Sequence, residues 1–396
     1  PLIASPTNID VDDRGRVWVC EVQNYRGHGA RDQRPDGDRI LIMEDTDGDG
    51  VADLTKVFYQ GRDVDAALGI CVFDGRVIVT CAPNVIQFTD VDGDDIPDLK
   101  SYLFTETGSP QNDHSTHSFV FGPDGHFYWN MGNAGLSVHD RDGRQVYDQL
   151  GSPVFDQRAS QWMDEYRNMK GRFWGGMVFR CDLSGRGFEV LGHNFRNNYE
   201  VTVDSYGNPW QSDNDDDGNY GVRLNYIMEH GNYGYLDELT GEGWRVPRVS
   251  AHADVSSRHW HQNDPGVVPN FVQTGAGSPT GITVYEGDLL PEPFRGKVLH
   301  CDAGPGVLWA ADGKVEGAGF AAEMVHLVES PTDKWFRPVD VAVAPDGSLF
   351  LSDWYDPVVG WNRQTDLGRG RIYRIAPRDH RYRVPDFDFK TAVGAA

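Results

Sequence analysis

Residues 341–351 read Val-Ala-Val-Ala-Pro-Asp-Gly-Ser-Leu-Phe-Leu, which is two alternating apolar runs joined by an Asp-Gly turn. Alternation with a period of two is typical of a half-buried β-strand, and Asp-Gly favours a tight hairpin. The same pattern recurs at residues 9–19, 70–79, 119–129, 201–210 and 282–299. Further strands are predicted between the copies, at residues 39–43, 84–88, 176–180 and 370–375. Six copies of a unit of roughly four strands predict an all-β chain folded as a six-bladed β-propeller.

The composition agrees with a chain of many short strands and turns. It includes 46 Gly and 22 Pro among 396 residues. Its 60 acidic and 36 basic side chains give a formal net charge of −24. This charge disfavours nucleic acid and anionic lipid as the main partner, because both are negatively charged. No apolar run reaches the roughly 18 residues of a membrane-spanning helix, so no membrane span is expected.

The repeat copies are unevenly spaced, which indicates insertions between some blades. We expect one propeller domain over residues 1–396, with long inserted loops at about 133–175 and 236–278. On a propeller, such loops either rim the central cavity or decorate the surface.

Two Asp-rich loops have the ligand spacing of a calcium loop. Alternating carboxylates can converge on one hard cation, whereas a solvated Asp-Gly hairpin tip is the alternative. The predicted ligands are Asp45, Asp47, Asp49 and Asp53 in the first loop and Asp90, Asp92, Asp94 and Asp98 in the second. A third acidic run, residues 213–218, follows a predicted inner strand and is expected to face the central cavity.

Two candidate catalytic residues precede inner hairpins. His114 lies just before the third hairpin and Arg196 just before the fourth. Because the segment that enters each inner strand lines one mouth of a propeller channel, we expect these side chains to meet there. A neutral His can take a proton from a hydroxyl group, and an Arg can stabilise the negative charge that develops.

Several segments resemble, in the same order, those of soluble quinoprotein sugar dehydrogenases of the glucose and sorbosone type. The segments are Phe121-Gly-Pro-Asp-Gly125 with His114 ahead of it, Gly192-His-Asn-Phe-Arg-Asn197, Glu229-His-Gly-Asn-Tyr-Gly-Tyr235, Ser278-Pro-Thr-Gly-Ile282 and Phe336-Arg-Pro-Val-Asp340. The closing segments 344–357 and 370–375 resemble more closely the propeller of planctomycete-type "membrane-bound dehydrogenase" proteins, whose longer members add a C-type haem domain.

The resemblance implies oxidation of an aldose at its hemiacetal carbon, by hydride transfer to pyrroloquinoline quinone (PQQ) with calcium assistance. His114 would be the general base, and Arg196 would contact the quinone and stabilise charge. The residues expected around the cofactor are His117, Asn197, Asn214, Asp215, Arg337, Asp353 and Tyr355. A calcium ion held near Asp213 and Asp217 would polarise the quinone.

One position departs from the family pattern. The dehydrogenases carry a Lys in the inner strand of the fifth blade, whereas residues 298–306 contain no Lys and supply Asp302. A cofactor-free, metal-assisted polysaccharide lyase or hydrolase and a carbohydrate-binding propeller therefore stay open as alternatives.

The electron acceptor and the location are also expectations. The five cysteines include no C-x-x-C-H sequence, so covalent haem is excluded and an external cytochrome is the expected acceptor. The calcium-type loops and the resemblance imply an extracytoplasmic protein, periplasmic or secreted. His252, His259 and His261 are candidates for a lid or a metal site.

Overall fold

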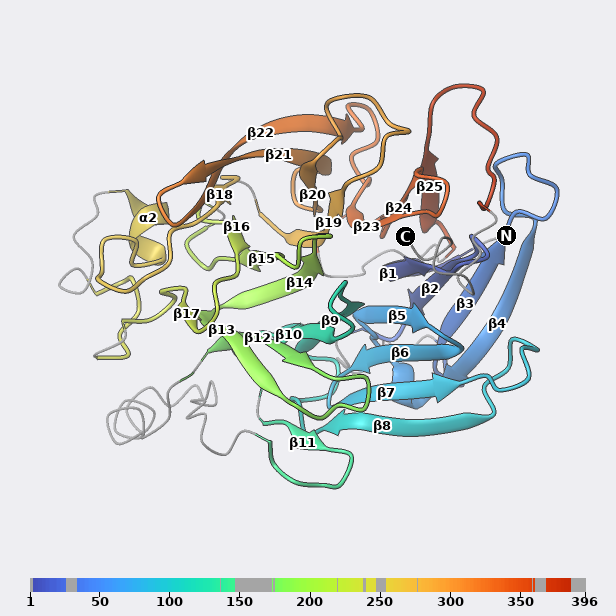
Figure 1. Cartoon of the computed structure of the whole chain (residues 1–396), viewed down its shortest axis with the longest axis horizontal. Coiled ribbons are helices and arrows are strands. Elements are labelled where there is room, and N and C mark those ends of the chain that lie inside the picture. Colours follow the sequence, from blue (N-terminus) through green and yellow to red (C-terminus); the bar gives the residue numbers. More distant parts are fainter. Residues whose placement is uncertain are drawn as a thin grey trace.

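Six β-sheets form a ring in the computed structural model, which confirms the predicted all-β, six-bladed propeller (Figure 1). The structure describes residues 3–25, 34–135, 137–146, 173, 175–218, 220–237, 240–246, 254–275, 277–357, 359 and 368–385. Within these residues, no helix is both long and apolar enough to cross a membrane.

Blades 1 to 3 come from the N-terminal half of the chain. Blade 1 consists of β1 (Ser5–Val11), β2 (Val17–Val22), β3 (Asp38–Glu44) and β4 (Leu54–Gly61). The short helix η1 (Arg62–Val64) leads to blade 2, which consists of β5 (Gly69–Phe73), β6 (Arg76–Cys81), β7 (Asn84–Thr89), β8 (Leu99–Thr105) and β11 (His139–Asp140). Blade 3 consists of β9 (Thr116–Phe121), β10 (Phe127–Met131), β12 (Gly176–Cys181), β13 (Glu189–Phe195) and β17 (Gly231–Asn232).

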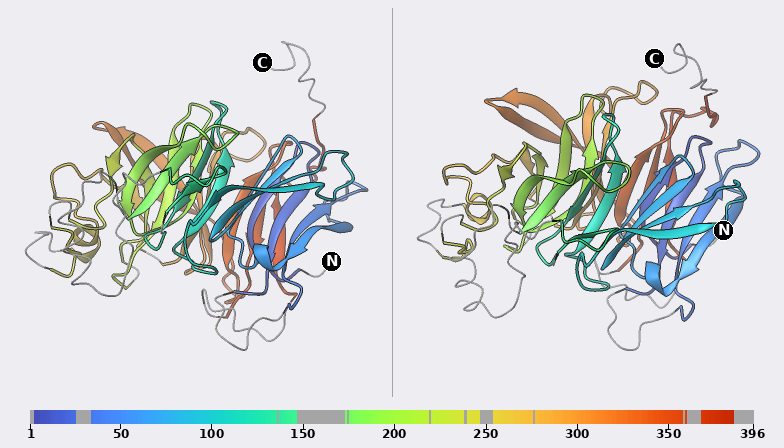
Figure 2. Two further views of the ribbon diagram at one scale, coloured as in Figure 1. Left: turned by 90° about the horizontal axis from the view of Figure 1, so that it is seen from below. Right: turned by 60° about the horizontal axis from the view of Figure 1, so that its bottom comes forward.

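Blades 4 to 6 complete the ring. Blade 4 consists of β14 (Asn197–Val203), β15 (Pro209–Asn214), β16 (Arg223–Tyr226) and β18 (Val272–Gln273). Blade 5 consists of β19 (Pro279–Tyr285), β20 (Lys297–Asp302), β21 (Val307–Glu316) and β22 (Gly319–Glu329), and its outer hairpin extends beyond the ring (Figure 2). Blade 6 consists of β23 (Pro338–Val343), β24 (Leu349–Asp353) and β25 (Arg371–Ile375).

All six predicted hairpins are the innermost hairpins of their blades. Their first strands contact one another in the order β1, β5, β9, β14, β19 and β23, and β23 contacts β1 again. The N-terminal Ile3 also pairs with Gly370, next to β25, which ties the first blade to the last.

The hydrophobic core lies between the blades. One buried cluster occupies each of the six junctions, and the cluster between blades 2 and 3 is rich in aromatic rings such as Phe104, Trp129 and Phe179. All five cysteines are buried and free, so they act as small apolar side chains.

The predicted insertions are described in part. Residues 147–172 and 174, most of the first insertion, lie outside the described residues. The second insertion contains the single-turn helix α2 (Val255–His259) and packs against blade 4. His252 lies outside the described residues, so its predicted role stays open.

Polar side chains connect neighbouring inner strands. An innermost strand is an edge strand, so its axis-facing N–H groups need acceptors from elsewhere. In four junctions the acceptor comes from the preceding blade: Asp340 for Ile9 N–H (2.7 Å), Asn8 for Ile70 (2.7 Å), Ser118 for Val201 (2.9 Å) and Glu200 for Ile282 (2.8 Å).

The other two junctions use glycine in place of an acceptor. In the inner strands of blades 2 and 5, Gly69 and Gly281 directly precede Ile70 and Ile282. They occupy the position that holds the acceptor residue in blades 1, 3, 4 and 6. A Cβ on Gly69 would lie 2.5 Å from the carbonyl oxygen of His117, and one on Gly281 would lie 2.5 Å from Cα of Asp340. The hydroxyl groups of Thr80 and Thr280 donate across these two junctions, to the carbonyls of His117 and Pro338.

Replacing Asn8 by Ala tests these connections. The buried N–H of Ile70 would lose its acceptor, so we expect the free energy of unfolding to fall by about 1–3 kcal/mol. Urea-induced unfolding followed by circular dichroism measures this change. Asn208→Ala is the matched control, because that side chain bonds Asp204 at a hairpin turn. An equal loss in both variants would contradict the expectation.

Candidate functional site

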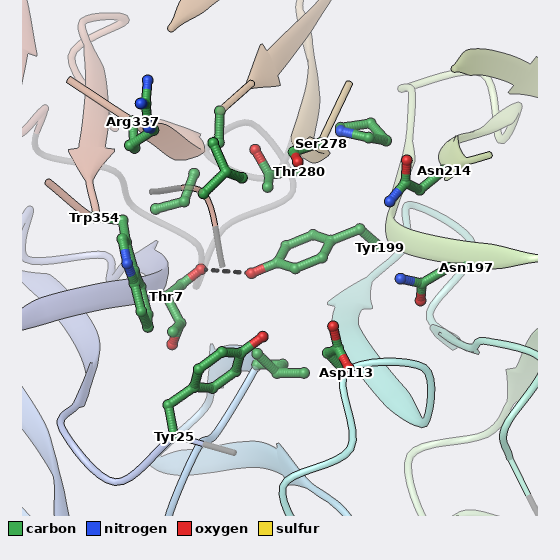
Figure 3. A pocket seen from close by; sticks show the side chains of 15 residues that line it. Thr7, Tyr25, Asp113, Asn197, Tyr199, Asn214, Ser278, Thr280, Arg337 and Trp354 are labelled. Carbon is green, nitrogen blue, oxygen red and sulfur yellow. Dashed lines mark hydrogen bonds between the residues drawn. The ribbon is translucent and has the colours of Figure 1, made fainter. Parts of the chain in front are cut away.

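A cavity of about 170 Å³ lies where the six inner hairpins meet (Figure 3). Its polar lining includes Thr7, Asp113, Asn197, Asn214, Ser278, Thr280 and Arg337, and its aromatic lining is Tyr25, Tyr199 and Trp354. Each of these residues lies near the start of the first strand or the end of the second strand of an inner hairpin. Because those ends face one mouth of the ring, residues far apart in sequence meet there.

His114 follows the cavity-lining Asp113 and is half-buried. Its Nδ1 lies 2.7 Å from Oδ1 of Asn133. An amide oxygen only accepts, so Nδ1 carries the proton and Nε2 keeps its lone pair. Burial, followed by the Arg196 guanidinium, lowers the pKa of His114 to about 4. The imidazole is therefore neutral near pH 7, as a general base requires.

His117 has a different environment, although it lies only three residues further along. It is fully buried, and its Nδ1 and Nε2 lie 2.6 Å and 2.8 Å from the backbone carbonyls of Asn198 and Asp113. Burial lowers its pKa. A neutral imidazole has one N–H group, so it donates to one of these two carbonyls, and the ring packs between the Asp113 segment and β14.

Arg196 and Asn197 enter the site at the start of β14. Oδ1 of Asp213 accepts their backbone N–H groups at 3.3 and 2.9 Å, and Nη1 of Arg196 donates to the carbonyl of Asn214 at 3.3 Å. The other oxygen of Asp213 pairs with Arg223 at 2.8 Å, and both side chains are fully buried. Asp213 is therefore neutralised by the protein.

Two other carboxylates of the third acidic run accept hydrogen bonds from the main chain that follows it. Oδ2 of Asp215 accepts the N–H of Gly221 at 2.6 Å, and Oδ1 of Asp217 accepts that of Tyr220 at 2.8 Å. Burial, together with a hydrogen bond to Asp217, raises the pKa of Asp215 to about 7. Asp302 is fully buried, its pKa is also raised to about 7 by burial, and its Oδ2 has no hydrogen-bond partner among the described residues.

Blade 6 contributes Arg337, Asp353 and Tyr355. Oδ1 of Asp353 accepts the backbone N–H groups of Arg337 and Tyr355 at 2.8 and 2.9 Å, and burial raises the pKa of Asp353 to about 6. The Arg337 side chain lines the cavity. The centroid of the Tyr355 ring lies 4.0 Å from the Arg371 guanidinium carbon. The neighbouring Trp354, and not Tyr355, lines the cavity.

The two Asp-rich loops lie outside the cavity, because they join the third and fourth strands of blades 1 and 2 (Figure 1). Carboxylate oxygens of Asp45, Asp47 and Asp49 lie within 4.8 Å of one another, and so do those of Asp90, Asp92 and Asp98. Clustered and remaining ligands alike accept hydrogen bonds within their loops: Asp45 from the N–H groups of Gly48 and Gly50, and Asp90 from that of Gly93. Asp53 accepts from Thr46, and Asp94 accepts from Ile96.

Of the predicted residues, Asn197, Asn214 and Arg337 line the cavity. His114 and Arg196 are not in its lining, but each is next in sequence to a lining residue, and the Arg196 guanidinium acts on the His114 ring. Sequence reasoning did not find Tyr25, Asp113, Tyr199 and Trp354. The sequence feature that could have identified them is their position relative to the inner hairpins. Tyr25 and Trp354 follow second strands, and Asp113 precedes a first strand. Tyr199 crosses the cavity, where its hydroxyl donates to the carbonyl of Thr7 at 3.1 Å (Figure 3).

Comparison with solved structures defines the class of fold. The PQQ-bound aldose sugar dehydrogenase of Streptomyces coelicolor matches with a TM-score of 0.61 at 16% sequence identity, over 95% of this chain and 96% of that one. The holo PQQ domain of Coprinopsis cinerea pyranose dehydrogenase matches with a TM-score of 0.56 at 13% identity, over 89% and 90%. A calcium structure of the Trichoderma reesei family AA12 enzyme matches with a TM-score of 0.55 at 14% identity, over 89% and 92%.

The sequence model of a family described as "Domain of unknown function (DUF7133)" matches residues 1–379, and the chain belongs to that family. No curated protein matches the sequence significantly. The likeness to the dehydrogenase structures shows a shared fold, and the planctomycete-type resemblance stays a prediction.

The pKa of His114 is directly measurable. Histidine-selective ¹³C labelling and an NMR titration, assigned by the signal lost in His114→Gln, should give about 4. In Arg196→Gln this pKa should rise toward 6.5, because a neighbouring positive charge disfavours imidazolium. Arg144→Gln removes an exposed guanidinium of blade 2 as the control. Equal values in all three proteins would contradict the assigned contact.

Proposed function

We propose that this chain is a sugar oxidoreductase that oxidises an aldose at its hemiacetal carbon, with PQQ as hydride acceptor. The observation that carries the proposal is one cavity lined by Arg337, Asn197 and Asn214, next to a neutral His114 and to Arg196. The printed hydrogen bonds of the two guanidinium groups go to backbone carbonyls, from Arg337 to Phe336 at 3.2 Å and from Arg196 to Asn214 at 3.3 Å.

His114 is suited to the proton transfer. Its Nε2 would accept the proton of the hydroxyl group on the reacting carbon, while Asn133 holds Nδ1–H and with it the orientation of the ring. The nearby Arg196 guanidinium would stabilise negative charge that develops as the proton leaves.

The residues present fit a polycarboxylate quinone. The buried Nε of Arg337 and the side-chain oxygens of Asn197 and Asn214 have no hydrogen-bond partner among the described residues. Arg337 and Arg196 would hold carboxylates of the cofactor, and Asn197 and Asn214 would contact its polar edge. Bound there, PQQ supplies a two-electron acceptor for the hydride that leaves the sugar carbon.

Asp302 is compatible with an anionic cofactor because of its burial. With its pKa raised to about 7, the carboxyl group is protonated at lower pH. A protonated carboxyl donates a hydrogen bond to a carboxylate, whereas an ionised one would repel it. A calcium ion beside the cofactor would be held by Asp215 and Asp217, because Asp213 is already paired with Arg223.

The opposite wall suits a carbohydrate. Tyr25 and Trp354 pack edge to face with ring centroids 5.5 Å apart, and Trp354 offers an apolar surface for a sugar ring. Asp113, Ser278 and Thr280 add polar groups that could hydrogen-bond its hydroxyls.

The two Asp-rich loops complete the proposal as structural calcium sites. Extracellular calcium is abundant enough to fill sites of modest affinity, which supports an extracytoplasmic location. An external cytochrome would then take the electrons onward.

Calcium should stabilise the protein. A ligand that binds only the folded state stabilises that state. We therefore expect the Tm in saturating calcium to be a few degrees higher than the Tm in the presence of a chelator. The double variant Asp47→Asn/Asp92→Asn should lose most of this increment, while Asp13→Asn, an exposed acid outside both loops, should keep it. An undiminished increment in the double variant would remove these loops as calcium sites.

Addition of PQQ, calcium, aldoses and a dye acceptor to the protein tests the function. We expect a change in the quinone spectrum on binding and reduction of the dye. His114→Gln should lower kcat by about 10²- to 10⁴-fold with quinone affinity retained, as expected for a lost general base. Arg337→Gln should weaken quinone binding, and the exposed Lys334→Gln should not.

Two results would contradict the proposed function. One is the absence of quinone binding in the presence of calcium. The other is turnover of a polysaccharide without any electron acceptor, which would favour a lyase or hydrolase instead.

A further inference from the structure

We infer that Trp260, within the insertion at 236–278, is a positioning residue for the cavity. Stacked on Arg223, it fixes Asp213 and, through Asp213, the main chain of Arg196 and Asn197. The effect on catalysis rests on the proposed function, but the positioning itself does not.

The first contact is between Trp260 and Arg223. The guanidinium carbon of Arg223 lies 3.5 Å from the centroid of the Trp260 ring and 5.7 Å from that of Phe195. Trp260 and Arg223 are both fully buried, and Nε1 of Trp260 donates to the carbonyl of Gly221. A desolvated cation over a tryptophan face is a strong form of this interaction.

The remaining faces of the Arg223 guanidinium are also occupied. Its Nη2 and Nε donate to Oδ2 of Asp213 at 2.8 and 3.2 Å, and its Nη1 donates to the carbonyl of Tyr233 and to Oδ1 of Asn270 at 2.8 and 2.9 Å. Trp260 and Asn270 both belong to the insertion. The insertion therefore sets the position of this arginine from two directions.

Asp213 transmits this position to the cavity. Its Oδ1 accepts the N–H groups of Arg196 and Asn197, and Arg196 in turn donates to the carbonyl of Asn214. A shift of Arg223 would release the carboxylate and so loosen the segment that carries the Arg196 guanidinium.

A second set of contacts from the insertion holds Asp216, within the same segment. Asp216 receives hydrogen bonds from Nε2 of His259 at 2.7 Å, Nε1 of Trp244 at 2.8 Å and Nη1 of Arg245 at 3.0 Å. All three donors belong to the insertion. His259 is thus a partner of a carboxylate that anchors residues 213–217, rather than a free ligand.

The pKa of His114 reports the position of Arg196 without any cofactor or substrate. The charged and titratable groups that face His114 are Arg196, Asp113 and His117, and Arg196 has the largest effect among them. If Arg196 moves away, imidazolium becomes less unfavourable and the pKa rises.

NMR titration of His114 in Trp260→Phe tests the inference. This variant keeps an aromatic ring but loses the N–H bond to Gly221 and part of the cation–π attraction. We expect the pKa of His114 to rise by about half a unit toward 6.5, as for a partly withdrawn positive charge. Asn270→Ala, a milder change at the same guanidinium, should shift it in the same direction and covers the case in which Trp260→Phe fails to fold.

Trp18→Phe is the matched control. Trp18 is also buried, donates from Nε1 to Asp12 at 3.0 Å and has the Arg16 guanidinium 5.6 Å from its ring centroid, but it lies in blade 1 away from Arg196. This variant should leave the pKa of His114 unchanged.

The outcomes separate positioning from packing. Unchanged pKa values in both Trp260→Phe and Asn270→Ala would overturn the inference, and so would a shift that persists in an Arg196→Gln background. A shift that disappears in that background supports it. A confirmed shift in a protein that neither binds quinone nor oxidises sugar would retain the positioning role and remove the proposed function.

Discussion

The hydrogen bond from the inner strand of one blade to the backbone of the next is the contact on which this structure depends. Asn8, Ser118, Glu200 and Asp340 each satisfy an N–H group that the edge of a sheet would otherwise leave unpaired. Apolar packing brings the blades together, but these directional bonds fix how far one inner strand lies from the next. The geometry of the central cavity follows from that spacing.

This arrangement places acidic side chains near the axis, with consequences for their ionisation. Glu200 and Asp340 are buried and hydrogen-bonded to each other, and burial raises the pKa of Glu200 and moves that of Asp340 to about 6. Two carboxylates so close cannot both ionise readily, so the pair shares a proton. Hydrogen bonds that backbone N–H groups donate to these two carboxylates offset part of the cost of burying them.

The cavity combines opposite charges, because Arg337 and Asp113 both line it. The guanidinium groups of Arg337 and of the neighbouring Arg196 donate to backbone carbonyls, and burial lowers the pKa of His114 so that its ring is neutral near pH 7. Asp213, a buried acid that accepts the backbone N–H of Arg196, is paired with Arg223, which contacts Trp260 of the insertion. These features support the proposed reaction, which requires a group that holds an anionic cofactor and a neutral base.

The sequence by itself determined the ring of six blades, because period-two alternation and Asp-Gly turns are local signals repeated along the chain. It also predicted that His114, Arg196, Asn197 and Arg337 lie at one mouth of the ring, because each precedes or begins an inner strand, and inner strands of a propeller start at one mouth. Only the tertiary structure decided which carboxylates of the acidic run are neutralised by an ion pair. Asp213 and Asp217 look alike in the acidic run, yet Asp213 is paired with Arg223 and Asp217 bonds a backbone N–H group. The walls formed by Tyr25, Tyr199 and Trp354 likewise depend on the ring, since burial and ion pairing arise from contacts between segments far apart in the chain.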